Sequence, residues 1–478
     1  MTVQQERKRV SAVVGAGLVL IAGMTWVSIL SPRFEYGSPL IERPHLLLVT
    51  ILMVCGAAYL LAAFSLQRIP SGRLGLIVLV LGAGVVLRAV TIFSNPIQED
   101  DYYRYLWDGA ATAHGFNPYP IVPAEVLDND ADPESPETLR ELAQESGLVY
   151  KRINHPELAT VYPPVAQGAF ALAHLIKPWS IGAWRVVLFG FDLATLGVLA
   201  LLLRALGKPL HLLAIYWWNP IVIKETFNSV HMDVLVLPFA LLALLFALGN
   251  RPIRSASALA LAIGVKIWPF LIGLLLYRGT KASRRQWAAA ATVFTLLLGL
   301  LAIPVFASMA LGDRSGLLAY GERWEMNDAL FMVFAKGTEI ASGLLGLQRG
   351  SADLIARVAV FVVLIAWTTM WSMKPAGSRQ EICNRIVLVV AAIFMLSPTQ
   401  FPWYYLWIVP FLALSPRPSM LVLTLMLPMY YLKFYFTAQD NVLFFHNRVV
   451  WIEYAPVLAI ALWEWYTRWH PRAAPEAV

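Results

Sequence analysis

The chain has 478 residues, of which 58% are hydrophobic and only 14% are charged, whereas about 25% of residues are charged in soluble domains. Its mean hydropathy is +0.62, and apolar runs of about 18 residues or more recur along its length. The net charge is +7, but the bases lie between apolar runs, where they act as topology signals rather than as a nucleic-acid surface. These features exclude a soluble enzyme and predict an integral membrane protein.

The two cysteines, Cys55 and Cys383, both lie in apolar stretches. We therefore expect no disulfide framework and no metal–thiolate site. The first apolar run, Val10–Leu30, follows a cluster of bases, as the apolar core of a signal peptide does. It is too long for such a core and lacks a small-residue cleavage site, so we expect a retained membrane anchor.

Apolar length and the residues that interrupt it predict the membrane crossings in chain order. We expect spans near Val10–Leu30, Pro44–Leu66, Leu74–Phe93, Ile181–Leu203, Leu210–Phe227, Met232–Leu248, Trp287–Met309, Leu354–Met373, Arg385–Leu396, Trp403–Leu414, Met420–Tyr435 and Val449–Trp465.

Basic residues set the expected orientation of these spans. The positive-inside rule places Arg7–Arg9 and the later basic loops in the cytoplasm, so residues 98–180 form a long first periplasmic loop. An interfacial helix is expected inside this loop, and Pro123–Glu145, rich in Pro, Asp and Glu, is expected to be irregular and solvated. Residues 1–478 are expected to form a single all-α polytopic membrane domain with about twelve transmembrane helices.

The apolar stretch Ser255–Tyr277 has basic residues on both sides. The positive-inside rule places both flanks in the cytoplasm, but a single crossing would put them on opposite sides of the membrane. A proline near its centre, Pro269, breaks a helix. We therefore predict a hairpin of two half-helices, each of about 12 residues and roughly 18 Å, with Lys266 at its tip. The stretch Asn327–Leu347 is ambiguous, and we expect a short helix on or dipping into the outer leaflet.

Three adjacent acids open the long outer loop, and thirteen acids but four bases lie between residues 98 and 160. On a helix that begins near Asp100, the residues Asp101, Arg104, Tyr105 and Asp108 share one face, which we expect to point to water or a cleft, with the intervening aromatic residues toward lipid or protein. One interpretation is a carboxylate that accepts a proton from a hydroxyl group. The other is that Asp100 caps the helix and Asp101 pairs with Arg104.

Several ions lie within or at the ends of apolar runs, where each charge costs a few kcal/mol and so indicates a site. Converging lysines would suit an anionic group such as a phosphate. Alternatively, Lys224 pairs with Glu225, Lys433 extends toward the interface, and His231 and Asp233 serve as structural hydrogen-bonding groups. The residues concerned are Lys224, Glu225, His231, Asp233, Lys266 and Lys433.

Two further segments combine polar and aromatic residues. Arg152 and His155 precede Tyr162-Pro163-Pro164 and could bind a phosphate or form an ordinary charged loop, while the prolines start the next membrane helix. In the second segment Gln400 lies beside Trp403. This pattern suits a sugar ring, and it is also typical of the aromatic belt at a membrane interface.

The chain has no GxSxG motif, P-loop, dinucleotide fingerprint or HExxH motif, which disfavours a nucleotide-using cytoplasmic enzyme. Instead, five segments in order resemble the GT-C superfamily of multi-span glycosyltransferases, and within it the bacterial polyprenol-phosphate-mannose-dependent mannosyltransferases. The segments are EDDYYRYLWDGAATAHGFNPY, YKRINHPELATVYPPVAQ, WNPIVIKETFNSVHMDVLVLPF, AIGVKIWPFLIGLLLYR and LSPTQFPWYYLW, between Glu99 and Trp407.

The resemblance implies an inverting transferase in the bacterial inner membrane, with its active site facing the periplasm or exterior. A sugar, mannose at the family level, would pass from a polyprenyl-phosphate donor to a hydroxyl group of a glycolipid, polysaccharide or protein. The catalytic base would be Asp101, with Asp100 as the alternative. The residues expected to bind substrate are Arg104, Asp108, Arg152, His155, Tyr162, Lys224, His231, Asp233, Lys266, Gln400, Trp403 and Lys433.

No cofactor is expected, because the donor's sugar–phosphate bond supplies the energy; a metal ion near the two aspartates is compatible with the sequence but is not predicted. The chain lacks the sizeable soluble C-terminal domain of larger relatives, so the outer loops are expected to recognise the acceptor. Two alternatives stay open. A lipid-linked glycan transporter or flippase would be expected to show paired repeats, and an oligosaccharide ligase or polymerase would be expected to carry more arginines in the outer loops.

Overall fold

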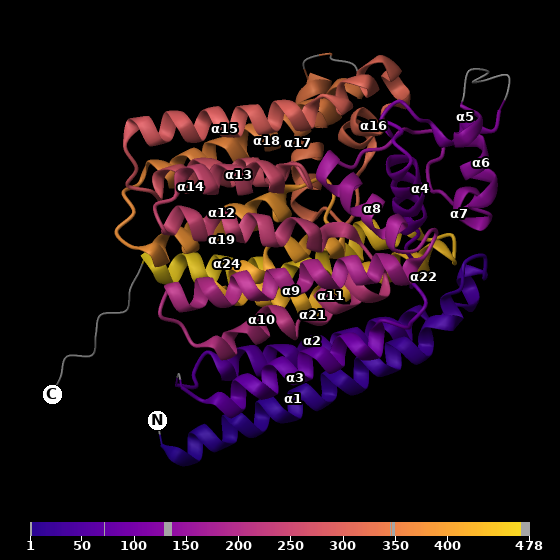
Figure 1. The fold of residues 1–478 in the computed structure, drawn as a ribbon. Helices are drawn as coiled ribbons and strands as arrows, with labels where there is room; N and C mark the ends of the chain where they lie inside the picture. Colours follow the sequence, from indigo (N-terminus) through magenta and orange to yellow (C-terminus); the bar gives the residue numbers. More distant parts are fainter. Residues whose placement is uncertain (1, 71, 129–135, 345, 347–348, 470–478) are drawn as a thin grey trace.

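The computed structural model describes the chain except residues 1, 71, 129–135, 345, 347–348 and 470–478. The regular secondary structure of the described residues is helical (Figure 1), and their one β-bridge joins Met326 to Thr399. The α-helices are α1 (Val3–Leu30), α2 (His45–Leu66), α3 (Leu74–Thr91), α4 (Asp101–Ala113), α5 (Pro123–Val126), α6 (Glu137–Glu145), α7 (Leu148–Lys151), α8 (Pro164–Ile176), α9 (Ile181–Ala205), α10 (Ala214–Trp217), α11 (Pro220–Ile223), α12 (Val236–Leu248), α13 (Pro252–Ile263), α14 (Gly273–Arg278), α15 (Arg284–Ala302), α16 (Gly316–Arg323), α17 (Ala329–Leu344), α18 (Arg349–Met373), α19 (Arg379–Leu396), α20 (Val409–Leu414), α21 (Pro418–Met426), α22 (Leu432–Thr437), α23 (Val442–Phe444) and α24 (Val450–Trp469).

Short 3-10 and π turns join these helices. They are η1 (Ser31–Phe34), η2 (Leu40–Glu42), η3 (Leu210–Leu213), η4 (Lys224–Asn228), η5 (Met232–Leu235), η6 (Trp268–Ile272), η7 (Pro304–Arg314), η8 (Pro402–Trp407), η9 (Leu427–Tyr431) and η10 (Phe445–Val449).

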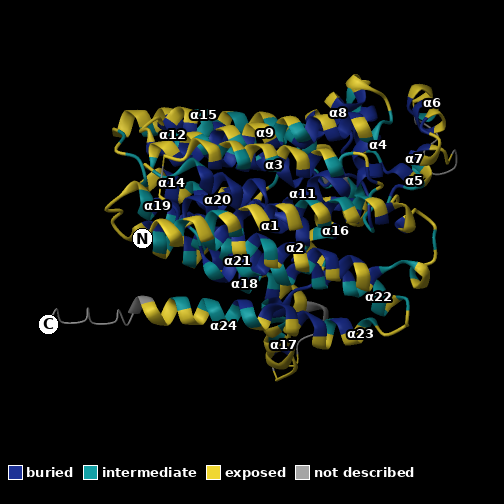
Figure 2. Ribbon diagram, turned by 90° about the horizontal axis from the view of Figure 1, so that it is seen from below, coloured by how far each residue is buried: buried dark blue, intermediate teal, exposed yellow. Residues whose placement is uncertain are grey.

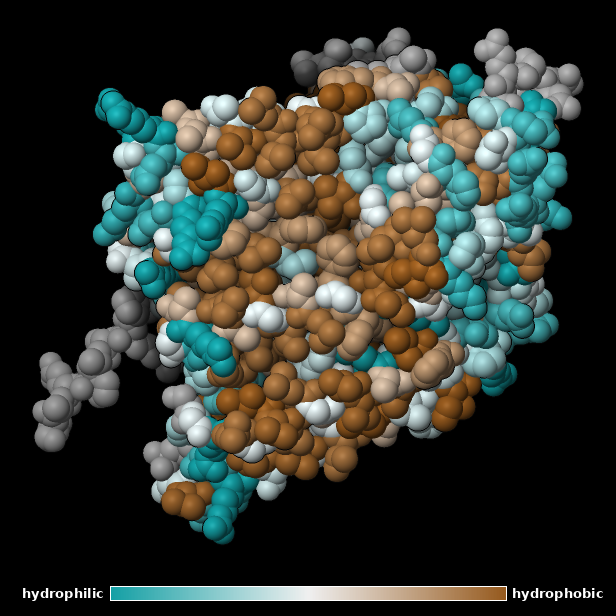
Figure 3. All heavy atoms as spheres, in the orientation of Figure 1, coloured by the Kyte–Doolittle hydropathy of each residue, from teal (hydrophilic) through white to brown (hydrophobic). Residues whose placement is uncertain are grey.

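The architecture confirms the predicted all-α polytopic membrane protein. Seven described helices are long and apolar enough to cross a membrane, or eight if one bent pair counts as a single span. Figure 3 shows the corresponding apolar belt between two hydrophilic ends. The seven include or largely overlap the spans predicted near Val10–Leu30, Pro44–Leu66, Leu74–Phe93, Ile181–Leu203, Trp287–Met309, Leu354–Met373 and Met420–Tyr435.

Some of the other predicted spans are broken, and the span predicted near Leu210–Phe227 is not a continuous helix. It consists of η3, α10, α11 and η4, and Met232–Leu248 is bent by 108° from Pro220–Asn228. The chain interrupts at Asn219-Pro220 because the Asn219 side chain accepts the Ile221 and Val222 amide protons, while proline donates none. The break places polar side chains inside the helical bundle.

The helical structure of the predicted hairpin is also interrupted near Pro269, as the sequence indicated. Helix α13 ends at Ile263, Lys266 follows, and the chain resumes with η6 and α14, which contacts α13. The Val165 amide, at the start of α8, donates to the Gly264 carbonyl oxygen at 2.8 Å. A Cβ atom at Gly264 would lie 2.5 Å from Val165 Cγ2, so glycine permits this close approach.

The basic turns gather at one end of the bundle. Arg9 Nη1 donates to the Arg68 carbonyl oxygen at 2.9 Å, which joins the start of α1 to the end of α2. Lys208 Nζ donates to the Leu414 carbonyl oxygen at 2.6 Å. Helices α4 to α8 lie at the opposite end (Figures 1 and 2).

At that opposite end, the protein encloses α4. Residues Tyr102–Ala111 are all buried, and α8 packs so closely that a Cβ atom at Gly109 would lie 2.4 Å from the Phe170 carbonyl oxygen. The prediction of an irregular Pro123–Glu145 is wrong for its described part from Glu137, because Leu139 and Leu142 on α6 pack against Trp107. Residues 129–135 lie outside the described part of the chain.

Candidate active site

The two candidate bases lie together at the N-terminus of α4. Asn154 Nδ2 donates to Asp101 Oδ1 at 2.6 Å and to Asp100 Oδ1 at 3.2 Å, so one amide holds both carboxyl groups. Asp100 occupies the N-cap position, but its side chain makes no capping hydrogen bond. The Asp101 side chain retains 26% of its surface exposed, which leaves room for contact with a substrate.

Burial disfavours the charged forms of this acidic run. It raises the pKa of the Asp100 carboxyl to about 6, and the adjacent Asp101 carboxylate adds to the shift. Burial also raises the pKa of Asp101, against the effect of the Asn154 hydrogen bond. The pKa of Glu99 rises to about 8 through burial, opposed by the Lys224 ammonium group. Perturbed carboxyl groups of this kind are typical of functional sites.

His231 faces Asp101 from the break between η4 and η5. Its Nδ1 atom lies 3.7 Å from Asp101 Oδ2, and its Nε2 atom lies 3.7 Å from Glu225 Oε2. The imidazole is fully buried and stacks on Trp403, with ring centroids 3.9 Å apart. Three segments distant in sequence therefore meet at this imidazole.

Lys224 is bound within the protein. Its ammonium group is buried, lies 3.3 Å from Glu225 Oε1, donates to Ser229 Oγ at 2.7 Å and also donates to the Tyr431 hydroxyl. The Tyr431 hydroxyl in turn donates to Glu225. The predicted alternative, in which Lys224 pairs with Glu225, is thus the arrangement that the structure adopts.

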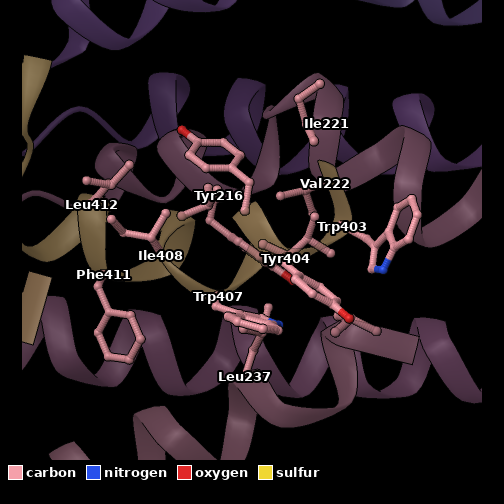
Figure 4. Close-up of a cluster of buried hydrophobic side chains, with 14 of the residues drawn as sticks. Tyr216, Ile221, Val222, Leu237, Trp403, Tyr404, Trp407, Ile408, Phe411 and Leu412 are labelled. Carbon is pink, nitrogen blue, oxygen red and sulfur yellow. The ribbon is translucent and has the colours of Figure 1, made fainter. Parts of the chain in front are cut away.

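Lys266 lies nearer the surface than Lys224. Its ammonium nitrogen is 3.2 Å from Asp233 Oδ1, and its side chain is 17% exposed. Trp407 Nε1 donates to the same Asp233 oxygen at 2.8 Å, and Lys266 lies over the Tyr404 ring at 4.4 Å. Figure 4 shows Trp407 and Tyr404 side by side, with Trp403 on the same segment. An accessible cation beside aromatic rings is suited to an anionic sugar-bearing ligand.

The predicted orientation of Arg104 and Asp108 toward water or a cleft is wrong, because the two pair inside the protein. Arg104 Nε lies 3.1 Å from Asp108 Oδ1, and their side chains are 6% and 3% exposed. Arg104 also donates to the Leu158 carbonyl oxygen at 2.6 Å, and Thr160 donates to Asp108 Oδ2 at 2.5 Å. Arg104 therefore pairs with Asp108 instead of Asp101, and it ties α4 to the segment that carries Asn154.

The remaining predicted residues are scattered around this centre. Arg152 donates to the Tyr103 hydroxyl at 2.8 Å, and His155 is exposed beside Trp324. Tyr162 packs edge-on against the Tyr105 ring at 5.1 Å.

Two predicted polar residues lie on other elements. Gln400 is buried and donates to the carbonyl oxygens of Met395 and Ser397, so its amide is engaged in holding its own turn. Lys433 is partly buried on α22 and lies 5.5 Å from the Phe434 ring.

Three residues of the cluster were not among the predicted site residues. Asn154 lies within the quoted loop motif, but an isolated asparagine gives no signal for which carboxylates it contacts. The sequence predicts Glu225 only as a partner of Lys224, and Tyr431 is not a predicted site residue. Each of the three contacts site residues that are far away in the sequence, and sequence spacing does not reveal such contacts. Among the described residues, no group of three or more His, Cys, Asp or Glu side chains could hold a metal ion.

Comparison with known proteins assigns the class. Residues 160–398, half of the chain, match Glycosyltransferase family 87, and the chain belongs to this family. The acidic segment at the start of α4 lies before the matched region.

A curated relative also matches across much of the chain. It is alpha-(1->6)-mannopyranosyltransferase A of Mycobacterium tuberculosis, 22% identical over 343 residues, which cover 68% of this chain. The chain spans 62% of the length of that relative. No solved structure matches the chain.

Proposed function

We propose that the protein is an inverting glycosyltransferase that moves mannose from a polyprenyl-phosphate donor to an acceptor hydroxyl group at the outer face of the membrane. The observation that carries the proposal is the partly exposed Asp101 carboxylate, held by Asn154 and faced by His231, at the end of the bundle opposite the basic turns. Family membership and the mannosyltransferase relative support the reaction class. A site at the end of the apolar belt suits a donor whose isoprenoid chain stays in the bilayer.

In the proposed reaction Asp101 accepts the proton of the acceptor hydroxyl group. The resulting oxygen nucleophile attacks the anomeric carbon from the face opposite the phosphate, and the bond between that carbon and the phosphate oxygen breaks. The sugar leaves with inverted configuration, and polyprenyl phosphate is the leaving group. Negative charge grows on the phosphate as the bond breaks, so a nearby cation stabilises the transition state more than the ground state.

Lys266 is the candidate for that cation. It is partly exposed and close enough to Asp101 to oppose the rise of the carboxyl pKa. Lys224 is fully buried and bound to Glu225, Ser229 and Tyr431, which assigns it a supporting role. Arg152 and His155 lie at the rim, where they can meet the headgroup of an approaching lipid.

The test is transfer of radiolabelled mannose by purified protein from three donor classes: polyprenyl-phosphate mannose, a polyprenyl-diphosphate-linked mannose and a nucleotide-linked mannose. We expect transfer from the first donor alone, with a product of opposite anomeric configuration by NMR. Transfer from the diphosphate donor alone would support the oligosaccharide ligase or polymerase alternative. Movement of a lipid-linked glycan across vesicle membranes without transfer would support the flippase alternative.

A further inference from the structure

His231 is a buried imidazole whose two ring nitrogens lack any hydrogen-bond partner. A buried polar atom without a partner costs free energy, so such a group is uncommon unless the site uses it. The side chain is 0% exposed and is packed flat against Trp403. Its two nitrogens point to different carboxylates, each at 3.7 Å.

Charged groups face His231 from each element around it. Asp101 approaches from α4, and Glu225 with Lys224 approaches from η4. Asp233 belongs to η5, two residues along the chain, and is held by Lys266 at the tip of the hairpin. The Lys224 and Lys266 ammonium groups disfavour a positive charge on the imidazole, and Asp101 and Glu225 are the carboxylates that face its two ring nitrogens.

The surroundings of Glu225 select one tautomer of His231. Burial disfavours the charged form of Glu225, but Glu225 pairs with the Lys224 ammonium group and accepts a hydrogen bond from Tyr431, and both contacts favour its carboxylate form. A carboxylate beside Nε2 favours a proton on that nitrogen. The Nδ1 atom then presents a lone pair to Asp101 Oδ2. The two atoms lie 3.7 Å apart, too far for a hydrogen bond, and Nδ1 is left as an acceptor that faces Asp101.

We propose that His231 is a positioning residue that accepts a hydrogen bond from Asp101 once Asp101 has taken the acceptor proton, with Glu225 fixing the tautomer. The inference rests on the proposed function. The proton leaves the acceptor oxygen, bonds to Asp101 Oδ2 and is then shared in an O–H···Nδ1 hydrogen bond, while the Nε2–H group faces the Glu225 carboxylate at 3.7 Å. No net charge is created at His231. Stabilising protonated Asp101 makes it a stronger base in the reaction.

The test compares His231→Phe, which keeps an aromatic ring on Trp403 but removes both nitrogens, with His231→Asn, which restores an oxygen near the Nδ1 position. We expect His231→Phe to lower kcat at least about tenfold with KM for both substrates within about twofold. The acid limb of the kcat/KM profile should move to lower pH by about one unit, because protonated Asp101 loses its acceptor. His231→Asn should recover part of both effects.

His174→Phe serves as the matched control, since His174 is also buried and packed against an aromatic ring, Trp179, outside the site. Unchanged kcat and an unchanged acid limb in His231→Phe would overturn the inference. NMR of protein labelled with 15N-histidine gives a second measurement that does not depend on folding of His231→Phe, with the His231 signal assigned from His231→Asn. A proton on Nε2 agrees with the inference, and a proton on Nδ1 at neutral pH overturns it. Absence of transfer by the wild type would instead count against the proposed function, and the tautomer would still be measured.

Discussion

At the residue scale, the acidic run at the start of α4 holds like charges close together with little water around them. Asp100 and Asp101 share the amide of Asn154, and burial raises the pKa of both carboxyl groups. Two carboxylates exposed to water would destabilise the folded state less. In the proposed mechanism this arrangement makes Asp101 a better acceptor for the proton of a hydroxyl group, at a cost in stability.

That cost predicts the effect of Asp100→Asn. The folded-state pKa of Asp100 is about 6, above its ordinary 3.8, so ionisation of this residue destabilises the fold above pH 6. Well below pH 3.8 both states are protonated and the penalty is absent. We expect Asp100→Asn to raise the thermal unfolding temperature at pH 8 and to leave it nearly unchanged at about pH 3, as measured by tryptophan fluorescence. An equal rise at both pH values would show that the gain does not come from the charge.

At the scale of elements, the Arg104–Asp108 pair links α4 to the segment that carries Asn154. Arg104 reaches the Leu158 carbonyl oxygen and Asp108 accepts from Thr160, so a single interior ion pair fixes a loop beside the site. The close approach of α8 at Gly109 leaves no space for a side chain at that position. Asn154 owes its position to this packing.

We predict that Arg104→Ala costs about 3–5 kcal/mol of stability, because it leaves the Asp108 carboxylate buried and unpaired. It should also lower kcat without raising KM for the donor, since the residue positions a loop and does not bind phosphate. Denaturant unfolding and steady-state kinetics measure the two effects. Arg314→Ala is the control, because its ion pair with Glu125 is 52% exposed on the arginine side and should contribute less than about 1 kcal/mol. A rise in donor KM with unchanged stability would contradict this prediction and would support a role for Arg104 in binding the donor phosphate.

Local rules predicted the elements better than the contacts between them. Apolar length placed seven spans, and Pro269 with the flanking bases predicted the hairpin, because chain continuity and proline geometry act within a few residues. The contacts within the site do not follow from such local rules. Helical spacing grouped Asp101 with Arg104 and Asp108, yet α8 and the Leu158 loop bury the latter two. Lys224 and Lys266 have the same chemistry in sequence, and only tertiary packing makes one a bound interior group and the other an accessible cation.

At the scale of the whole molecule, an apolar belt separates the basic turns from the acidic site (Figure 3). Under the positive-inside rule, the proposed orientation has the basic turns in the cytoplasm and α4 to α8 outside. In the proposed function, this division would let a lipid-linked donor and an acceptor meet on the outer side of the membrane.

This orientation predicts which introduced cysteines an impermeant maleimide reaches in intact cells. Glu141→Cys on α6 should be labelled directly, whereas Lys281→Cys, between α14 and α15, should be labelled only after the membrane is opened; both positions are exposed. The native Cys55 and Cys383 are buried, so the parent chain is the control for background. The reverse labelling pattern would place the acidic site in the cytoplasm and contradict the proposed outer-face reaction.

The most direct test of the account is mannosyl transfer from synthetic polyprenyl-phosphate mannose by wild type, Asp100→Asn and Asp101→Asn, each shown to be folded. Loss of a positioned general base costs about 10²–10⁴-fold in rate, and we expect Asp101→Asn to lose activity on that scale at unchanged donor KM. Asp100→Asn should retain most activity, because Asp100 lacks the contact with His231 that Asp101 makes. Near-normal rates for Asp101→Asn would show that this carboxylate is structural and that the catalytic base lies elsewhere.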